Sequence, residues 1–249
     1  ARVLIVGQTW RRGRWQDDDA TTRARKLRLA TAREYDVLLM TREAFAAIPL
    51  RGEQLDRLVD RDPEFTRQDA LETGEKAFAG QFRYQRKDVK SIRDWLRAHY
   101  ARYARAEEEM RATGEPVVYW EDLGDFLVAD EAHAYKNMHP PLTVFGQHLK
   151  YAGQGEASER AMDFFWKAET VRQKSNGKGT ALLTASIVKN SPLELYSLTK
   201  LAVGPQAIPG VRTLREVGRR YMDVESAVVL DSKGEVAGAT AVVGFKNIQ

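Results

Sequence analysis

Two carboxylates and a histidine stand directly behind a short apolar run near the middle of the chain. Residues 126–129 are Phe-Leu-Val-Ala, and residues 130–133 are Asp-Glu-Ala-His. Such a run predicts a buried strand, and open α/β sheets bind ligands at the carboxyl ends of their strands. A carboxylate at that point can hold the Mg²⁺ of a bound nucleotide, and a second one can polarise an attacking water. Asp130 and Glu131 are therefore the first candidates for phosphate chemistry.

A second predicted strand ends in hydroxyl side chains. Residues 181–184 are Ala-Leu-Leu-Thr, and Ala185 and Ser186 follow them. If both strands belong to one parallel sheet, their carboxyl ends point to the same rim. That rim is where the phosphates of a nucleotide would sit.

The elements that must position this rim alternate between strand and helix. Residues 3–6 and 37–40 predict two buried strands, apolar on both faces as in a parallel sheet covered by helices. A helix between them begins after the N-cap Asp19 and ends near Ala32. Strand, helix and strand at this spacing form a βαβ unit, so the predicted fold class is α/β.

A long helix over residues 86–112 is predicted before the acidic strand, because apolar residues recur there at three- and four-residue steps. Its other side chains are largely basic and suit either a solvated surface or one that faces phosphates. These basic residues include Lys90, Arg93, Arg97, Arg102 and Arg105. Further helices are predicted over residues 53–59, 158–174, 191–202 and 213–222, and strands over 227–230 and 239–243.

The composition of the 249 residues, 43% hydrophobic and 30% charged, indicates a soluble globular protein of one large or two small domains. No apolar stretch approaches the roughly 18 residues of a membrane span. The chain has no cysteine, which excludes disulfides and thiolate chemistry and fits a reducing cytoplasm. A net charge of +4 is compatible with nucleic acid, and basic residues cluster between Arg11 and Arg28.

A metal site of another kind is an open alternative. The four histidines lack the tight spacing of a zinc site. His133 and His139 could nevertheless share a metal with Asp130, in a metal-dependent enzyme unrelated to nucleotides.

These motifs resemble the first RecA-like lobe of superfamily 2 helicases of the Snf2-related branch. The sequence Asp-Glu-Ala-His followed by Lys136 and Asn137 is typical of that branch, as is a Leu-Leu-Thr-Ala strand followed by a Leu-Glu-Leu-Tyr-Ser-Leu helix. The chain is most similar to the large polyvalent helicases of phages and plasmids, which are often fused to an adenine-N6 DNA methylase. That similarity rests on a long insertion before the acidic strand and on Thr41, Phe45, Ile48, Pro49, Val243, Gly244, Phe245, Asn247 and Ile248.

The resemblance implies roles for individual residues. Asp130 would hold Mg²⁺, usually through a water, and Glu131 would polarise the water that attacks the γ-phosphate of ATP. His133 would link the nucleotide site to a second lobe and to the strand end at Thr184, Ala185 and Ser186, which would couple hydrolysis to DNA movement. Thr41 and Arg42 would contact the DNA backbone. Lys136 and Asn137 are expected to be structural loop residues.

Two departures from the family pattern limit what this chain can do. Ile187 stands where the family usually has a proline, so the fixed turn after Ser186 is lost. No Gly-x-x-x-x-Gly-Lys-Ser/Thr loop, the Walker A motif, occurs anywhere in the sequence. Residues 177–180, Gly-Lys-Gly-Thr, precede a strand and do not open a helix, so they cannot replace it. The chain alone should not hydrolyse ATP.

The predicted organisation is therefore a partial RecA-like lobe, a parallel sheet flanked by helices. Residues 1–203 would form that lobe without its Walker A part, with a helical insertion at about 51–115, and residues 204–249 would lead toward a second lobe. Both ends look cut, so we expect an internal piece of a longer DNA-dependent ATPase whose partners are DNA, the Walker A segment and the second lobe. The alternative is a non-catalytic DNA-binding or scaffold module.

Overall fold

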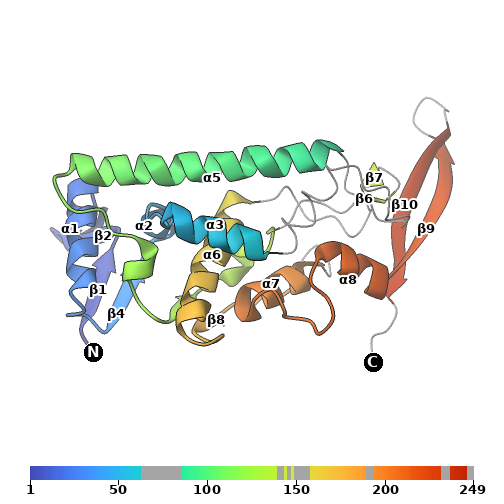
Figure 1. Cartoon of the computed structure of the whole chain (residues 1–249). Coiled ribbons are helices and arrows are strands. Elements are labelled where there is room, and N and C mark those ends of the chain that lie inside the picture. Colours follow the sequence, from blue (N-terminus) through green and yellow to red (C-terminus); the bar gives the residue numbers. More distant parts are fainter. Residues whose placement is uncertain are drawn as a thin grey trace.

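A computed structural model describes residues 1–62, 86–138, 143–144, 147–148, 158–188, 193–230 and 236–245. In that part of the chain, pairs of parallel strands are flanked by helices (Figure 1). The fold is α/β and consistent with a partial RecA-like lobe, as the sequence predicts.

The first parallel pair is the predicted βαβ unit. Strand β1 (Val3–Val6) pairs with β4 (Val37–Met40) in parallel. Helix α1 (Ala20–Thr31) lies between them in the chain, and the Asp19 carboxylate accepts the Thr22 N–H at 2.7 Å as its N-cap. A hairpin of β2 (Gln8–Arg11) and β3 (Arg14–Asp17) precedes α1 and was not expected. Its two strands are short and mostly polar, so they lack the alternation of apolar and polar residues that predicts a strand.

The second parallel pair carries the two predicted strand ends. Strand β5 (Leu127–Ala129) pairs with β8 (Thr180–Leu182), which begins one residue earlier than the sequence predicts. Between them lie the short 3₁₀ helix η2 (Ala132–Tyr135), the two-residue strands β6 (Thr143–Val144) and β7 (Gln147–His148), and helix α6 (Glu159–Lys174). Within the described residues, no strand hydrogen-bonds this pair to β1 and β4.

The prediction that the strands are buried on both faces is wrong. Alternate side chains are uncovered: Val3 is 48% exposed, Leu39 52% and Val128 52%. The side chains between them, such as Val6 and Ala129, lie in the core. An apolar run shows that a strand is hydrophobic, but it does not show whether one face or both are covered.

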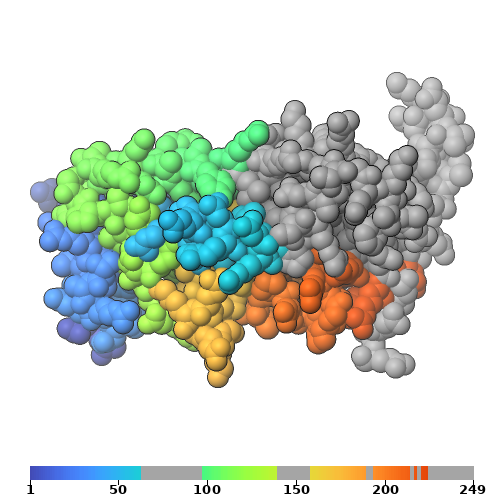
Figure 2. All heavy atoms as spheres, in the orientation of Figure 1, coloured from blue at the N-terminus to red at the C-terminus, as the bar shows by residue number. Residues whose placement is uncertain are grey.

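Helix α6 is the centre of the packing. Most of its side chains are buried, including the charged Asp163, Lys167 and Arg172. Phe164, Phe165 and Trp166 are each at most 1% exposed, so the helix is enclosed by other elements. Helix α3 (Gly52–Arg61) lies at the surface between α5 and α6 (Figure 2). Two short helices, α2 (Arg42–Ala46) and η1 (Trp120–Asp122), precede α3 and β5 in the chain.

Helix α5 (Arg86–Ala112) has the predicted bounds and runs along one side of the molecule (Figure 1). Tyr103 lies on its buried side at 3% exposure, whereas Tyr100 is 38% exposed. Its side chains from 86 to 96, among them Lys90 and Arg93, lie outside the described residues.

The remaining elements follow the predicted order. Helix α7 (Leu193–Val203) is followed by α8 (Leu214–Tyr221) and by an antiparallel hairpin of β9 (Met222–Leu230) and β10 (Val236–Phe245). Both strands are longer than predicted. Residues 189–192, before α7, and 231–235, between the last two strands, lie outside the described residues. None of the described helices combines the length and apolar character needed to cross a membrane.

Candidate functional site

The two predicted strand ends meet in one place. Beyond the paired strands, Leu183 N donates to Ala129 O at 2.8 Å, and Ala132 N donates to Leu183 O at 2.9 Å. These bonds join the loop after β5 (residues 130–133, the acidic loop) to the loop after β8 (residues 183–186, the hydroxyl loop). The rim expected from the sequence is therefore present as a continuous backbone structure.

Glu131 holds an uncommon backbone conformation on this rim. Its φ of 53° and ψ of 47° lie in the left-handed region, which costs a side-chain-bearing residue about 1 kcal/mol or more. The Asp130 carboxylate accepts the Glu131 N–H at 2.9 Å and helps to hold the turn. Residues kept in such conformations cluster at functional sites.

Three side chains assigned to the site contact one another. His133 Nδ1 lies 3.1 Å from Glu131 Oε2 and 3.3 Å from Thr184 Oγ1. The Thr184 hydroxyl in turn accepts the Ser186 N–H at 3.2 Å, which fixes the loop after β8. His133 is therefore a bridge between the acidic loop and the hydroxyl loop.

The carboxylates are open to solvent, as a site that admits a ligand must be. Asp130 and Glu131 are both exposed. One Asp130 oxygen is engaged by a backbone N–H, which leaves the other for a cation or for a water bound to it. Mg²⁺ suits such a site, because it takes one or two carboxylates together with waters and phosphate oxygens. The described residues contain no cluster of three metal-binding side chains, and His139 lies outside them.

A buried ion pair connects the loop after β5 to helix α7. Lys136 Nζ lies 2.7 Å from Glu194 Oε1 in α7, and the two side chains are 12% and 1% exposed. The Asn137 carbonyl accepts the Ser158 N–H at 2.8 Å and so joins the same loop to the start of α6. In these contacts Lys136 and Asn137 connect the loop to α7 and α6.

Thr41 and Arg42 lie at the carboxyl end of the other strand pair. Thr41 N donates to Val6 O at 3.2 Å, and the Thr41 hydroxyl caps α2. Arg42 is exposed. Phe45 of α2 and Tyr135 of η2 both pack against Phe164 of α6, with ring centroids 5.8 and 4.4 Å from that of Phe164. The two groups of predicted residues are neighbours, although in the described chain no hydrogen bond joins them.

The basic surface predicted for α5 is only partly present. Arg97 is exposed as expected. Arg102 instead turns inward and forms an ion pair of 2.7 Å with Asp163, whose side chain is 1% exposed. Helical periodicity placed Arg102 among the solvated residues because it cannot reveal a buried carboxylate on another helix.

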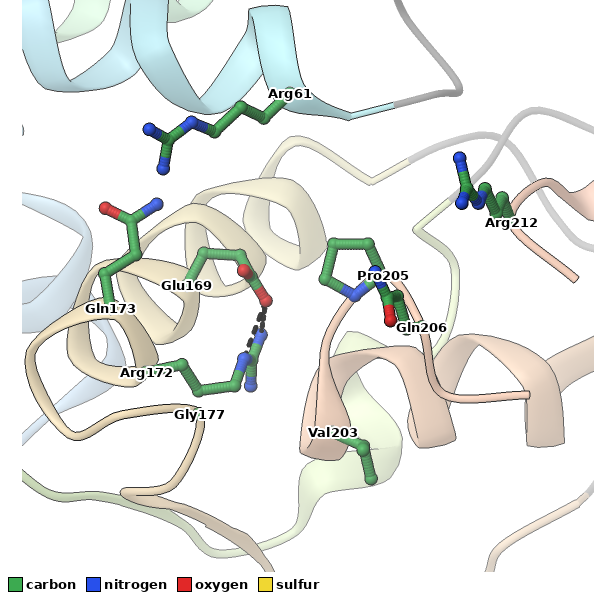
Figure 3. A pocket seen from close by; sticks show the side chains of 9 residues that line it. All are labelled: Arg61, Glu169, Arg172, Gln173, Gly177, Val203, Pro205, Gln206 and Arg212. Carbon is green, nitrogen blue, oxygen red and sulfur yellow. Dashed lines mark hydrogen bonds and ion pairs between the residues drawn. The ribbon is translucent and has the colours of Figure 1, made fainter. Parts of the chain in front are cut away.

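A cavity of about 470 Å³ lies near the amino end of β8, away from the rim (Figure 3). In its wall, the buried Arg172 guanidinium donates from Nε to Glu169 Oε1 at 2.6 Å and from Nη1 to Leu201 O at 2.6 Å. Burial raises the pKa of Glu169 and lowers that of Arg172, while their attraction opposes both shifts. No predicted site residue lines this cavity. Its lining residues are Arg61, Glu169, Arg172, Gln173, Gly177, Val203, Pro205, Gln206 and Arg212.

Comparison with known proteins identifies the class of the domain. Residues 14–213 match the family model described as "Probable helicase domain", so the chain belongs to this family. It is also 28% identical over 238 residues to the "Defense against restriction protein B" of Escherichia phage P1, a match that covers 93% of this chain. The chain spans about 10% of the length of that phage protein. No solved structure matches it.

Proposed function

We propose that the chain is part of the first motor lobe of a DNA-dependent ATPase of the DEAH type, related to the Snf2 branch. The longer protein couples ATP hydrolysis to movement along DNA or to strand separation. Membership of a helicase-domain family supports an action on nucleic acid. The similarity to a phage protein named for defence against restriction favours DNA as the polymer.

One observation carries this proposal. His133 lies within hydrogen-bond distance of both Glu131 and Thr184, at 3.1 and 3.3 Å. These are the residues to which the resemblance gives the water-polarising and coupling roles. A proton or a bound phosphate that changes the Glu131–His133 contact also changes the contact of His133 with the loop after β8. This pair of contacts supports the proposal that His133 transmits a change at a bound nucleotide to the loop after β8.

Within this proposal each residue has a defined task. Asp130 would hold the Mg²⁺ of ATP, usually through a water, and the metal would supply positive charge beside the phosphates. Glu131 accepts a hydrogen bond from the attacking water and increases its nucleophilicity. Thr184 and Ser186 fix the loop whose movement is passed on to DNA. Thr41 and Arg42 contact the backbone of the DNA, which a motor holds without regard to sequence.

The sequence context gives the first test. If the reading frame upstream of Ala1 encodes a strand followed by a glycine-rich loop ending in Gly-Lys-Thr or Gly-Lys-Ser, the longer protein has the missing phosphate-binding half. If translation begins at this point, or the upstream frame lacks such a loop, the ATPase proposal fails. The purified 249-residue chain should show no steady ATP turnover, and turnover that is lost on Glu131→Gln would overturn that expectation.

A non-catalytic DNA-binding module is the second candidate. It is favoured by the absence of a Walker A loop from this sequence and by the exposed arginines near the amino terminus. DNA affinity that falls steeply with salt, and that neither ATP nor Mg²⁺ changes, would favour this candidate.

A further inference from the structure

The hairpin of β2 and β3 exposes two tryptophans. Trp10 and Trp15 lie opposite each other across the two strands and are 58% and 50% exposed. Their ring centroids are 5.3 Å apart, with the planes inclined by 70°. Tryptophan is among the most buried residue types on average, so an exposed pair needs an explanation. An edge-to-face pair stabilises a hairpin, but it also leaves one ring face open for stacking.

The tip of the same hairpin carries unbalanced positive charge. Arg11 and Arg14 lie directly opposite each other, an arrangement that destabilises a strand pair. Arg12 stands next to them in the turn. Among the described residues, none of the three guanidinium groups forms an ion pair of 4.0 Å or less with a carboxylate, although Arg11 attracts Asp19 from a greater distance. A polyanion bound at the tip would relieve this repulsion.

The acidic residues beside the hairpin offset only part of its charge. Asp18 is buried and accepts hydrogen bonds from Gly7 N at 2.9 Å, Thr9 Oγ1 at 2.6 Å and Lys26 Nζ at 2.7 Å. Burial opposes ionisation of Asp18, but these bonds outweigh burial and hold its pKa below the usual value. Asp19 is the N-cap of α1, and the attraction of Arg11 is one of the causes that hold its pKa below the usual value. Asp17 on β3 accepts a hydrogen bond from Gln8 Nε2 at 3.1 Å, near the base of the hairpin. The three arginines leave the tip itself positive.

The hairpin is rigidly mounted. Its two turn residues, Arg12 and Gly13, have φ of 50° and 76°, as the tight turns that match strand twist require. At its base, Lys26 of α1 donates to Gln8 O at 2.7 Å. A rigid platform loses little entropy when it binds a ligand.

The hairpin begins at the carboxyl end of β1, beside Thr41 at the carboxyl end of β4. It follows β1 through Gly7, whose φ is 102°. A side chain at Gly7 would collide with Thr41, so the base of the hairpin and the loop after β4 are in close contact. DNA held at Thr41 and Arg42 would pass near the tryptophans.

We infer that the β2–β3 hairpin binds single-stranded DNA, with unpaired bases stacked on Trp10 and Trp15 and phosphates held by Arg11, Arg12 and Arg14. Aromatic side chains interleaved with basic ones bind single strands in this way, because every unpaired base has a face that can stack. A duplex offers base edges and not faces. This inference rests on the proposed interaction of the protein with DNA and adds the element and the form of DNA.

The test measures binding of the 249-residue chain to a fluorescently labelled 20-nucleotide oligothymidylate, a duplex of equal length and polyglutamate. Trp10→Val/Trp15→Val keeps residues that favour strands and removes the rings. Arg11→Gln/Arg14→Gln removes charge at the tip, and Arg33→Gln/Arg57→Gln removes the same charge elsewhere. Circular dichroism of each variant checks that it is folded.

We expect the tryptophan variant to bind oligothymidylate about tenfold more weakly or worse, since stacking contributes about 5- to 150-fold per base in such sites and two rings are removed. Its affinity for duplex should change less than about twofold. The affinity falls as salt rises, and the plot of log affinity against log salt should be less steep for the Arg11/Arg14 variant, by about 1.5 in slope. The Arg33/Arg57 control should bind oligothymidylate as the unaltered chain does.

Tryptophan fluorescence gives a second measurement. Oligothymidylate should quench the emission of the unaltered chain, because the exposed Trp10 and Trp15 would stack on bases while Trp120 and Trp166 are buried. The sequence also contains Trp95, so the quenching should be lost in Trp10→Val/Trp15→Val. Unchanged emission at saturating oligothymidylate would overturn the inference.

Other outcomes separate this inference from the proposed function. If oligothymidylate binds equally well to the tryptophan variant, the hairpin inference fails while the DNA interaction stands. If the tryptophans matter equally for duplex, the assignment to single strands fails. If the chain binds polyglutamate but no DNA, the hairpin is a site for an acidic protein, and the proposed DNA interaction at this lobe fails with it.

Discussion

Lys136 and Glu194 form an ion pair of 2.7 Å between the loop after β5 and helix α7. The Glu194 side chain is 1% exposed, so its charge requires compensation inside the protein. The pair attaches the loop after β5 to α7, in addition to the backbone hydrogen bonds that join this loop to Leu183.

Breaking this pair should destabilise the domain. We predict that Lys136→Met lowers the free energy of unfolding by about 2–4 kcal/mol, because it leaves a buried carboxylate without this cation. Glu194→Gln should cost less, and the double variant should recover part of the loss. Urea denaturation of the four proteins gives the coupling energy. A coupling energy near zero would show that the pair does not hold the loop.

Gly179 should be indispensable for the β5–β8 pairing. Its φ is 89°, and a Cβ there would lie 2.8 Å from Asp125 O and 2.9 Å from Val171 Cγ1. Gly177 has a φ of 83° with nothing near its Cβ position. Gly177→Ala should therefore cost about 1 kcal/mol for the backbone conformation alone, and Gly179→Ala about 3 kcal/mol or more. Equal losses in thermal denaturation would contradict the steric argument.

Lys167 should titrate far below an ordinary lysine. Its Nζ is fully buried and lies 3.0 Å from Asp163 Oδ2 and 2.6 Å from Phe45 O. Burial lowers its pKa to about 8, against the attraction of Asp163. Between pH 8 and about 10.4, the ordinary lysine pKa, the unfolded chain binds more protons at this residue than the folded chain does. The contribution of Lys167 to the free energy of unfolding therefore rises with pH across this window.

Nuclear magnetic resonance of ¹³C-labelled lysine tests this directly. One lysine signal, absent from Lys167→Met, should titrate near pH 8. Titration of that signal above pH 10 would contradict the predicted shift.

If the backbone at Glu131 is strained, replacing Glu131 by glycine should destabilise the domain less than a glycine substitution elsewhere does. Glu131→Gly removes a side chain from a left-handed position with φ of 53°, so the domain should be no less stable than before. Glu108→Gly, in the exposed interior of α5, should cost about 1 kcal/mol. A loss on Glu131→Gly as large as that on Glu108→Gly would mean that the conformation at Glu131 carries no strain.

The sequence predicted those features that depend on local pattern. The βαβ unit, the bounds of α5, the Asp19 cap and the meeting of the strand ends near Asp130 and Thr184 all follow from apolar runs, helical spacing and capping residues. Features that depend on partners far away in the chain were missed. The inward turn of Arg102 toward Asp163 depends on how α5 packs on α6, and the pairing of Lys136 with Glu194 depends on the position of α7. The hairpin around Trp10 and Trp15 was hidden because its strands carry arginines and glutamines.

The roles proposed for Asp130, Glu131 and His133 rest on the resemblance and on the contacts of His133, and a kinetic measurement tests them. The most direct measurement is DNA-stimulated ATP hydrolysis by the longer protein that contains this chain, compared between the unaltered form, Glu131→Gln and the matched control Glu108→Gln on α5. The proposed function predicts hydrolysis that depends on DNA and falls at least a hundredfold in Glu131→Gln, with the Glu108→Gln rate unchanged. Equal rates in all three proteins, or none in the unaltered protein, would contradict it.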